Sequence, residues 1–138
     1  MFLPWHIYEE AEADGVQVHF LHMESLSSVS VPQHIGLDPE KLPTIAQENT
    51  AAVHELGHVT TGSFYTVSSP CDERRRCEIR ADRAAIVRHI DKEELLRLLE
   101  GEKRPLWEIA EHFGFTEEFI RKALCLYRNG NLAPEYYS

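Results

Sequence analysis

Two histidines and a glutamate stand close together in the stretch His54-Glu55-Leu56-Gly57-His58. Histidines four positions apart lie on one face of a helix, so their imidazoles can share one metal ion. Zinc binds imidazole nitrogen, and a catalytic zinc site keeps one position open for water. Glu55 lies about 100° round the helix from His54, so its carboxylate can face that water without binding the metal. The pattern therefore predicts a zinc-dependent hydrolase, with a peptidase as the first interpretation and Glu55 as its general base.

A catalytic zinc usually has three protein ligands, so two histidines leave the site one ligand short. Glu78 is the strongest candidate, because enough chain separates it from His58 for a loop and a second helix that packs back on the first. Asp82 follows on the same helix face, where it can accept the N–H of a ligating histidine and orient its ring. His89 would lie about 16 Å from Glu78 along that helix, which excludes it as a ligand of the same ion. The other candidates, better explained as surface, buried or structural side chains, are His6, His19, His22, His34, His112, Cys71 and Cys77.

A central helix must carry the two histidines. Thr44 and Gln47 have the form of a capping box, which marks a helix start. We expect the helix to end near residues 60–61, because Gly62 is a typical C-terminal stop. Gly57 costs up to about 1 kcal/mol within a helix relative to alanine. It therefore indicates either a close neighbour or clearance beside the ion.

A second helix must carry the candidate third ligand. We expect it from about residue 73 to His89, with Asp72 as its N-cap, after a loop over residues 63–70. One side of this helix is basic, and it is expected to be either a solvated face or a docking surface for an acidic partner. The arginines of that side are Arg74, Arg75, Arg76, Arg80 and Arg83.

The flanking segments supply the rest of the architecture. Before residue 44 we expect a helix over residues 7–13, ended at Gly15, and alternating strands at 16–20, 28–31 and 34–37. After residue 90 we expect three more helices, over 91–101, 105–112 and 116–127, with Asp91 capping the first and Gly114 joining the last two.

The composition bounds the class of protein. With 138 residues, 43% apolar and 27% charged, the chain is typical of one soluble globular domain. The net charge of −9 disfavours nonspecific binding to nucleic acid or an anionic membrane. No apolar run of about 18 residues and no secretion signal is evident, and three cysteines fit a reducing compartment. We therefore expect a cytoplasmic protein without a membrane partner, as a monomer or weak oligomer.

Two stretches together carry a resemblance to a known family. They are His-Glu-Leu-Gly-His-Val-Thr-Thr-Gly-Ser-Phe-Tyr at 54–65 and Cys-Glu-Ile-Arg-Ala-Asp-Arg-Ala-Ala-Ile at 77–86. An H-E-x-x-H followed by E-x-x-x-D looks like the gluzincin class of metallopeptidases. Within that class, the stretch from His54 to Ile86 closely resembles the ImmA/IrrE family. The expected elements on either side also suit that family, so the resemblance covers most of the chain.

The resemblance implies a zinc-dependent endopeptidase with one Zn²⁺ per chain. Such enzymes typically cleave helix-turn-helix transcriptional repressors of phages, mobile elements or stress responses. From its own charge, we expect this chain not to bind nucleic acid directly. Carried over to this sequence, the ligands are His54, His58 and Glu78, the base is Glu55, and Asp82 supports a histidine. The resemblance does not assign a residue of this chain as the transition-state stabiliser. Tyr65 is the nearest phenolic donor, equally well explained by packing in its loop, and His34 and His89 are further alternatives.

The implied fold is α+β. A small N-terminal mixed sheet packs on a zincin-like active-site helix, and a mostly helical C-terminal half follows. We expect a single domain over residues 1–138, and we expect the substrate to lie extended along an edge strand within residues 28–37. The expected domain consists of a helix plus sheet in 1–43, the metal-site helices in 44–90, helices with helix-turn-helix-like packing in 91–128, and a tail in 129–138.

Two other functions compete with the peptidase. Residues 106–123 resemble a helix-turn-helix DNA-binding module, but Glu117 and Glu118 at the start of its second helix would repel phosphates. The other competitor is a non-catalytic zinc-binding regulatory protein, in which the ion only joins two helices. Structural zinc sites usually have four protein ligands, often including cysteine. A fourth ligand such as Cys71 or Cys77 would therefore favour that alternative.

Overall fold

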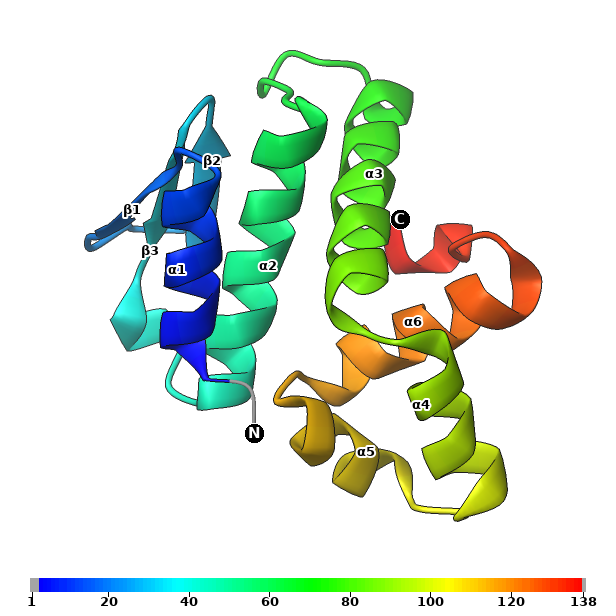
Figure 1. Cartoon of the computed structure of the whole chain (residues 1–138). Coiled ribbons are helices and arrows are strands. Elements are labelled where there is room, and N and C mark those ends of the chain that lie inside the picture. Colours follow the sequence, from blue (N-terminus) through cyan, green and yellow to red (C-terminus); the bar gives the residue numbers. More distant parts are fainter. Residues whose placement is uncertain (1–2, 138) are drawn as a thin grey trace.

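The computed structural model describes residues 3–137, and within that range it has six α-helices and one three-stranded sheet (Figure 1). This confirms the α+β class, with a small mixed sheet near the N-terminus and a helical C-terminal half. Met1, Phe2 and Ser138, which the expected ranges 1–43 and 129–138 include, lie outside the described residues. The helices are α1 (Pro4–Ala13), α2 (Ile45–Thr61), α3 (Cys71–His89), α4 (Lys92–Leu96), α5 (Leu106–Phe113) and α6 (Glu117–Asn129).

The sheet consists of β1 (Gln17–Phe20), β2 (Ser28–Val31) and β3 (His34–Leu37) in the order β1-β3-β2. β3 pairs in parallel with β1 and antiparallel with β2, so the sheet is mixed. The expectation of an edge strand within residues 28–37 is therefore correct only for β2. β3 is central, because β1 pairs with the side of β3 that β2 leaves open.

α2 lies between the sheet and α3 and is set at both ends by its sequence (Figure 1). Thr44 is the N-cap and forms the predicted capping box with Gln47, and Gly62 ends the helix at φ 66°. Gly57 has a close neighbour, because a Cβ there would lie 2.3 Å from the carbonyl oxygen of Ala81 on α3. The absence of a side chain at Gly57 thus lets the two site helices approach one another.

α3 begins at Cys71, two residues before the expected start, so the assignment of Asp72 as N-cap is wrong. Pro70 is the N-cap, because its extended backbone precedes the helix and its carbonyl accepts the N–H of Arg74 at 3.0 Å. Asp72 instead lies in the first turn, where a negative charge favours the helix dipole. α1 likewise begins earlier than expected, at Pro4, whose fixed φ suits a first helical turn.

The C-terminal half follows the expected order of helices. Asp91 caps α4, which continues as a π-helical turn to Gly101. Thr116 caps α6 after Gly114 ends α5, and a 3₁₀ turn over Pro134–Tyr137 brings the tail beside α3 (Figure 1). Buried apolar side chains from α1 through the segment after α6 form one continuous cluster among the described residues. Within residues 3–137, none of the helices is long and apolar enough to span a bilayer.

Candidate metal centre

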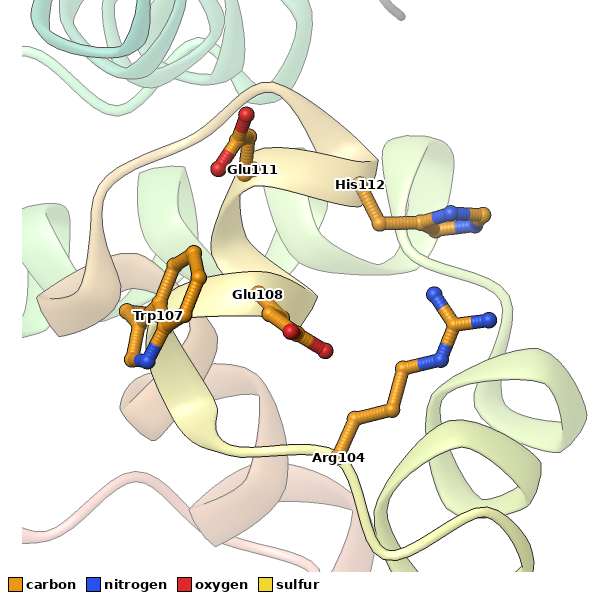
Figure 2. A pocket seen from close by; sticks show the side chains of 5 residues that line it. All are labelled: Arg104, Trp107, Glu108, Glu111 and His112. Carbon is orange, nitrogen blue, oxygen red and sulfur yellow. The ribbon is translucent and has the colours of Figure 1, made fainter.

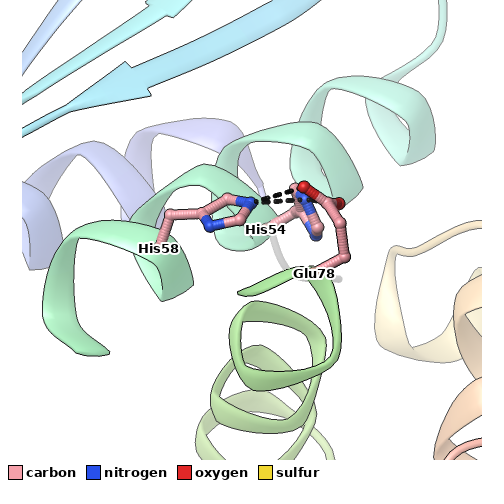
Figure 3. A group of neighbouring side chains, drawn as sticks. All are labelled: His54, His58 and Glu78. Carbon is pink, nitrogen blue, oxygen red and sulfur yellow. Dashed lines mark hydrogen bonds and ion pairs between the residues drawn. The ribbon is translucent and has the colours of Figure 1, made fainter. Parts of the chain in front are cut away.

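Three side chains meet where α2 and α3 face one another (Figure 3). The Nε2 atoms of His54 and His58 lie 3.1 Å apart. Glu78 places one carboxylate oxygen 2.9 Å from His54 Nε2 and the other 3.0 Å from His58 Nε2. The structure therefore brings together the three candidate ligands that the sequence predicted.

The arrangement fits a metal ion. Donor atoms of a tetrahedral ion with bonds of about 2.0–2.1 Å are about 3.3 Å apart. The observed separations of 2.9, 3.0 and 3.1 Å are only slightly shorter. Two imidazoles and one carboxylate leave room in such a geometry for a fourth, non-protein ligand. Among the described residues, neither Cys71, which is exposed, nor Cys77, which is buried, belongs to this group.

Both imidazoles are oriented by a second contact. Asp82 Oδ1 lies 2.7 Å from His54 Nδ1, and the carbonyl oxygen of Ser63 lies 2.6 Å from His58 Nδ1. An acceptor at Nδ1 keeps a proton on that nitrogen, so Nε2 is the nitrogen left to bind a metal ion. Asp82 thus lies where the spacing predicted, whereas the role of the Ser63 carbonyl carries no signal in the sequence.

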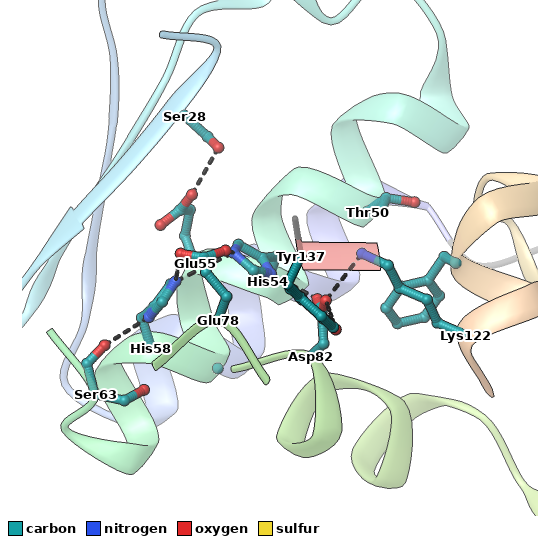
Figure 4. Close-up of polar contacts among 12 residues, drawn as sticks. Ser28, Thr50, His54, Glu55, His58, Ser63, Glu78, Asp82, Lys122 and Tyr137 are labelled. Carbon is teal, nitrogen blue, oxygen red and sulfur yellow. Dashed lines mark hydrogen bonds and ion pairs between the residues drawn. The ribbon is translucent and has the colours of Figure 1, made fainter. Parts of the chain in front are cut away.

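Asp82 has two further partners that the sequence did not reveal (Figure 4). Lys122 Nζ lies 2.9 Å from Asp82 Oδ2, and the Tyr137 hydroxyl donates to the same oxygen at 2.6 Å. Lys122 comes from α6 and Tyr137 from the C-terminal 3₁₀ turn, so the packing of distant segments creates these contacts.

Glu55 points from α2 toward the edge strand β2 (Figure 4). The hydroxyls of Ser28 and Ser30 each donate to one of its carboxylate oxygens at 2.7 Å. The two serines alternate with valines along β2, so both project from the same face of the strand. The alternation was visible in the sequence, but its orientation toward Glu55 was not.

Tyr65 lies at the centre, while the two alternatives to it do not. Its hydroxyl donates to Glu78 Oε1 at 2.7 Å. His34 instead contacts His19 on the sheet, and His89 Nε2 contacts Glu10 on α1 at 2.7 Å. His34 and His89 are therefore wrong as candidates for a group acting at this centre.

A cavity of about 550 Å³ opens over the three ligands. Glu55 and Tyr65 both line it, together with residues of β2 and of the loop after α2. Several of the lining side chains are apolar, and Val67 at the rim is almost fully exposed. The apolar lining residues are Leu26, Val29, Phe64 and Val67. The cavity thus combines acid–base groups and ligands with apolar walls.

The charges of the side chains at the centre compensate one another. Burial alone would lower the pKa of His54, but hydrogen bonds with Asp82 and Glu78 outweigh it and raise the pKa to about 10. Burial would raise the pKa of Glu78, but its contacts with the imidazoles hold it well below its usual range. Burial and the bond to Glu78 raise the pKa of Tyr65 to about 12, so its phenol is a neutral donor at pH 7. A positive charge on His54 thus occupies the place suited to a cation.

A second group, formed by His22, Asp38 and Glu40, also has its donor atoms close together. His22 and Glu40 are largely exposed, and Asp38 already accepts the backbone N–H groups of Met23 and Glu40. Lys41 Nζ lies 3.5 Å from Asp38 and opposes a cation there. This group is therefore explained by its loop.

Comparison with protein-family models, with curated proteins and with solved structures gives no match to this chain.

Proposed function

We propose that this chain is a zinc-dependent endopeptidase that holds one Zn²⁺ between His54, His58 and Glu78. The observation that carries the proposal is the convergence of these three donors, with a carboxylate base and a phenol lining the same cavity. Three protein donors rather than four favour a catalytic over a structural zinc site. Zinc, when bound, supplies a water of near-neutral pKa and a Lewis acid that polarises a carbonyl.

The residues of the chain would then divide the work of peptide hydrolysis. Glu55 would accept the proton of the attacking water and deliver it to the leaving amine. The hydroxyls of Ser28 and Ser30 hold its carboxylate toward the cavity. Asp82 and the Ser63 carbonyl keep the two imidazoles in the tautomer that binds a metal.

Tyr65 would stabilise the oxyanion of the tetrahedral intermediate. Its phenol is neutral at physiological pH, since its pKa is raised to about 12. It can exchange its bond to Glu78 for one to the substrate oxygen, because its side chain is partly exposed at the cavity. A hydrogen-bond donor aimed at a developing oxyanion contributes about 3–4 kcal/mol in well-studied enzymes.

The substrate would lie along β2. This strand is at the edge of the sheet and forms one wall of the cavity, so an extended peptide can pair with its backbone while the scissile bond faces Glu55. The resemblance to the ImmA/IrrE family favours a helix-turn-helix transcriptional repressor of a phage, mobile element or stress regulon as substrate. The reaction would then take place in the cytoplasm.

Replacement of Glu55 by Gln tests the assignment of the base. The zinc-loaded protein is incubated with helix-turn-helix repressors from the genome that encodes it, and fragments are identified by mass spectrometry. We expect the wild type to cleave at one site. Glu55→Gln should bind zinc as tightly but cleave at least about 100-fold more slowly, because general-base catalysis contributes about 10²–10⁴-fold. Unchanged cleavage by Glu55→Gln would reject the base.

A further inference from the structure

Asp82 connects the candidate metal centre to the C-terminal part of the chain (Figure 4). Its side chain is only 3% exposed, and its two oxygens have separate tasks. Oδ1 contacts His54, while Oδ2 receives both Lys122 and the Tyr137 hydroxyl. All the contacts of this carboxylate are thus shared between one candidate ligand and two residues far along the sequence.

Lys122 and Tyr137 are themselves held in place. The side chain of Lys122 is 16% exposed, and its Nζ lies 5.1 Å from the centre of the Tyr137 ring. A buried carboxylate oxygen without donors is costly, so an Asp82 that lost both would turn or draw in water. Either response would loosen its bond to His54. The orientation of that imidazole therefore depends on contacts made on the far side of Asp82.

We propose that Lys122 and Tyr137 are positioning residues for the metal ligand His54. Through Asp82 they fix the ring and its Nδ1 proton, so that α6 and the C-terminal turn set the metal affinity of a centre that they do not touch. The inference rests on the metal site of the proposed function but not on proteolysis.

Zinc affinity measured by competition with a chromophoric chelator tests this proposal. We expect Lys122→Met and Tyr137→Phe each to weaken zinc binding about tenfold, the lower end of the loss caused by removing a direct partner of a ligating histidine, because both act through Asp82. Lys122→Arg, which keeps the charge and donors, should restore most of the affinity. Tyr137→Phe removes a single oxygen, so it stays informative if Lys122→Met fails to fold.

Two controls separate positioning from a general loss of stability. Arg121→Met removes a positive charge from the same helix at an exposed position, and it should leave zinc affinity unchanged. In an Asp82→Ala background, Lys122→Met should cause no further loss, because the two residues act in series. The visible spectrum of the Co²⁺-loaded protein should change in Lys122→Met but not in Arg121→Met.

Equal zinc affinity in wild type, Lys122→Met and Tyr137→Phe would overturn the inference, as would additive losses with Asp82→Ala. A wild type that binds zinc but cleaves nothing would reject the proposed peptidase and leave the positioning role standing. A wild type that binds no zinc would reject both.

A second, independent feature is an exposed tryptophan on α5 (Figure 2). Trp107 is 57% exposed and projects between two hollows, of about 540 and 370 Å³. The smaller hollow is mainly apolar and includes Ile45 from the start of α2. We name Trp107 with the three acids around it, Glu108, Glu111 and Glu117, the acidic tryptophan surface.

The acids of this surface are not neutralised. Glu108, Glu111 and Glu117 have no ion pair or side-chain hydrogen bond within the described part of the chain, whereas Arg104 is engaged by Glu102. The smaller hollow includes the turn between α5 and α6, which leads into the helix that would enter the major groove in a helix-turn-helix. Here the negative charge repels phosphates and attracts a basic partner.

We infer that the acidic tryptophan surface docks a basic segment of a partner protein that inserts an apolar side chain beside Trp107. Charge complementarity selects the partner, and the mainly apolar hollow between Trp107 and Ile45 receives its side chain. The surface is composed of residues other than those lining the cavity of the metal centre, so docking there leaves that cavity open.

This docking surface is tested by titration with a helical peptide that has one lysine face and one leucine face. Binding is followed by Trp107 fluorescence in a Trp5→Phe background. We expect micromolar binding that weakens with salt and falls at least tenfold in Glu111→Lys and in Trp107→Ala, the latter measured by displacement of a labelled peptide. Glu9→Lys, an exposed charge reversal on α1, is the matched control and should bind normally. The inference would be overturned if Glu9→Lys lost as much peptide affinity as Glu111→Lys, or if a glutamate–leucine peptide bound as tightly as the lysine–leucine peptide. Binding of a 20-base-pair DNA duplex in place of the basic peptide would also overturn it.

Discussion

Each side chain at the centre of this protein has a partner that orients it. His54 is held by Asp82, His58 by the Ser63 carbonyl, and Glu55 by two serines of β2. Such contacts would keep the proposed ligands and base in one geometry before a substrate binds, which is the usual requirement for efficient catalysis. The serines belong to the strand that we propose as the peptide-binding edge. The base is therefore tied to the wall along which its substrate would lie.

Replacing Ser30 by Ala tests the role of that tie. A hydrogen bond to a charged group contributes about 1.5–3 kcal/mol. We expect Ser30→Ala to slow cleavage about tenfold, because Glu55 loses a donor that orients it, and to leave zinc affinity unchanged. Ser25→Ala, in the exposed loop before β2, is the control and should cleave as the wild type does. Loss of zinc affinity in Ser30→Ala would contradict this account.

Among the elements, the packing of α2 on α3 decides whether the centre forms. The ligands come from both helices, and Gly57 permits their close approach beside Ala81. The loop before β2 is fixed in a different way, by the Asp38 carboxylate, which accepts the N–H of Met23 at 3.0 Å. The approach of Gly57 to Ala81 thus affects the distance between the candidate ligands. The contact between Asp38 and Met23 affects the loop that leads into the edge strand.

Gly57→Ala should damage both stability and metal binding. The added Cβ would meet the Ala81 carbonyl at 2.3 Å, so the helices must separate. Overpacking costs about 1–3 kcal/mol, while alanine returns up to about 1 kcal/mol of helix propensity. We expect a net loss of about 1–2 kcal/mol in the free energy of unfolding by urea, and weaker zinc binding because Glu78 moves with α3.

Gly101→Ala provides the comparison. A Cβ at Gly101 would lie 3.9 Å from the nearest atom, in Arg97, which is ordinary contact. Its zinc affinity should therefore match the wild type. If Gly57→Ala binds zinc as well as Gly101→Ala does, the close approach of α2 and α3 is not what holds the centre together.

The stability contributed by Asp38 should depend on pH with a definite sign. Its hydrogen bond from Met23 lowers the pKa of this carboxyl below the reference value of 3.8, despite its burial. A depressed pKa stabilises the fold above pH 3.8, and that stability is lost as the pH falls through the lower, folded-state value. Asp38→Asn should therefore unfold at lower urea than the wild type at pH 7.

The difference between Asp38→Asn and the wild type should begin to shrink below about pH 4, where the unfolded chain binds a proton at Asp38, and should be lost as the pH falls through the lower, folded-state pKa. Urea unfolding at pH 7, 5 and 3 measures it. Glu24→Gln, in the same loop but exposed, should show little difference at any of the three. A deficit in Asp38→Asn that stays constant down to pH 3 would show that its charge is not the cause.

In the molecule as a whole, one apolar core joins the sheet, the site helices and the C-terminal half. Lys122 and Tyr137 reach Asp82 only because that core packs α6 and the last turn against α3. Metal binding and global folding should therefore be coupled, since a ligand that binds only the folded state stabilises it.

Removal of zinc by a chelator should lower the melting temperature. At a free zinc concentration about 100-fold above the dissociation constant, binding contributes about 2.7 kcal/mol. For a chain of this size that corresponds to about 10 °C, measured by calorimetry as one cooperative transition. His58→Ala should melt at the same temperature with and without zinc, whereas His112→Ala, on the surface of α5, should keep the shift. An equal shift in His58→Ala would place the bound zinc elsewhere.

The sequence predicted the parts of this molecule that short-range rules govern. Helical periodicity placed His54, His58, Glu78 and Asp82, and the capping box at Thr44 marked the start of α2. Period-two alternation located β2 and β3 to the residue. These features depend on neighbours within a few positions, which is why a single sequence reveals them.

The features that the sequence missed all depend on tertiary packing. Ser30 had no visible link to Glu55, and Lys122 and Tyr137 had none to Asp82, because those pairs are distant in the sequence. β3 is central because β1 pairs with it, and no local sequence pattern indicates that pairing. The early starts of α3 and α1 were local errors, since Pro70 rather than Asp72 caps α3 and α1 begins at Pro4.

The metal content of purified wild type and Glu78→Ala tests the central claim most directly. Elemental analysis after dialysis against trace zinc gives the stoichiometry, and X-ray absorption gives the ligand types. We predict one zinc per chain in the wild type, bound by two imidazoles and oxygen without sulfur, and a loss of zinc from Glu78→Ala. A wild type without zinc, a sulfur ligand at the ion, or full zinc occupancy in Glu78→Ala would contradict the site described here.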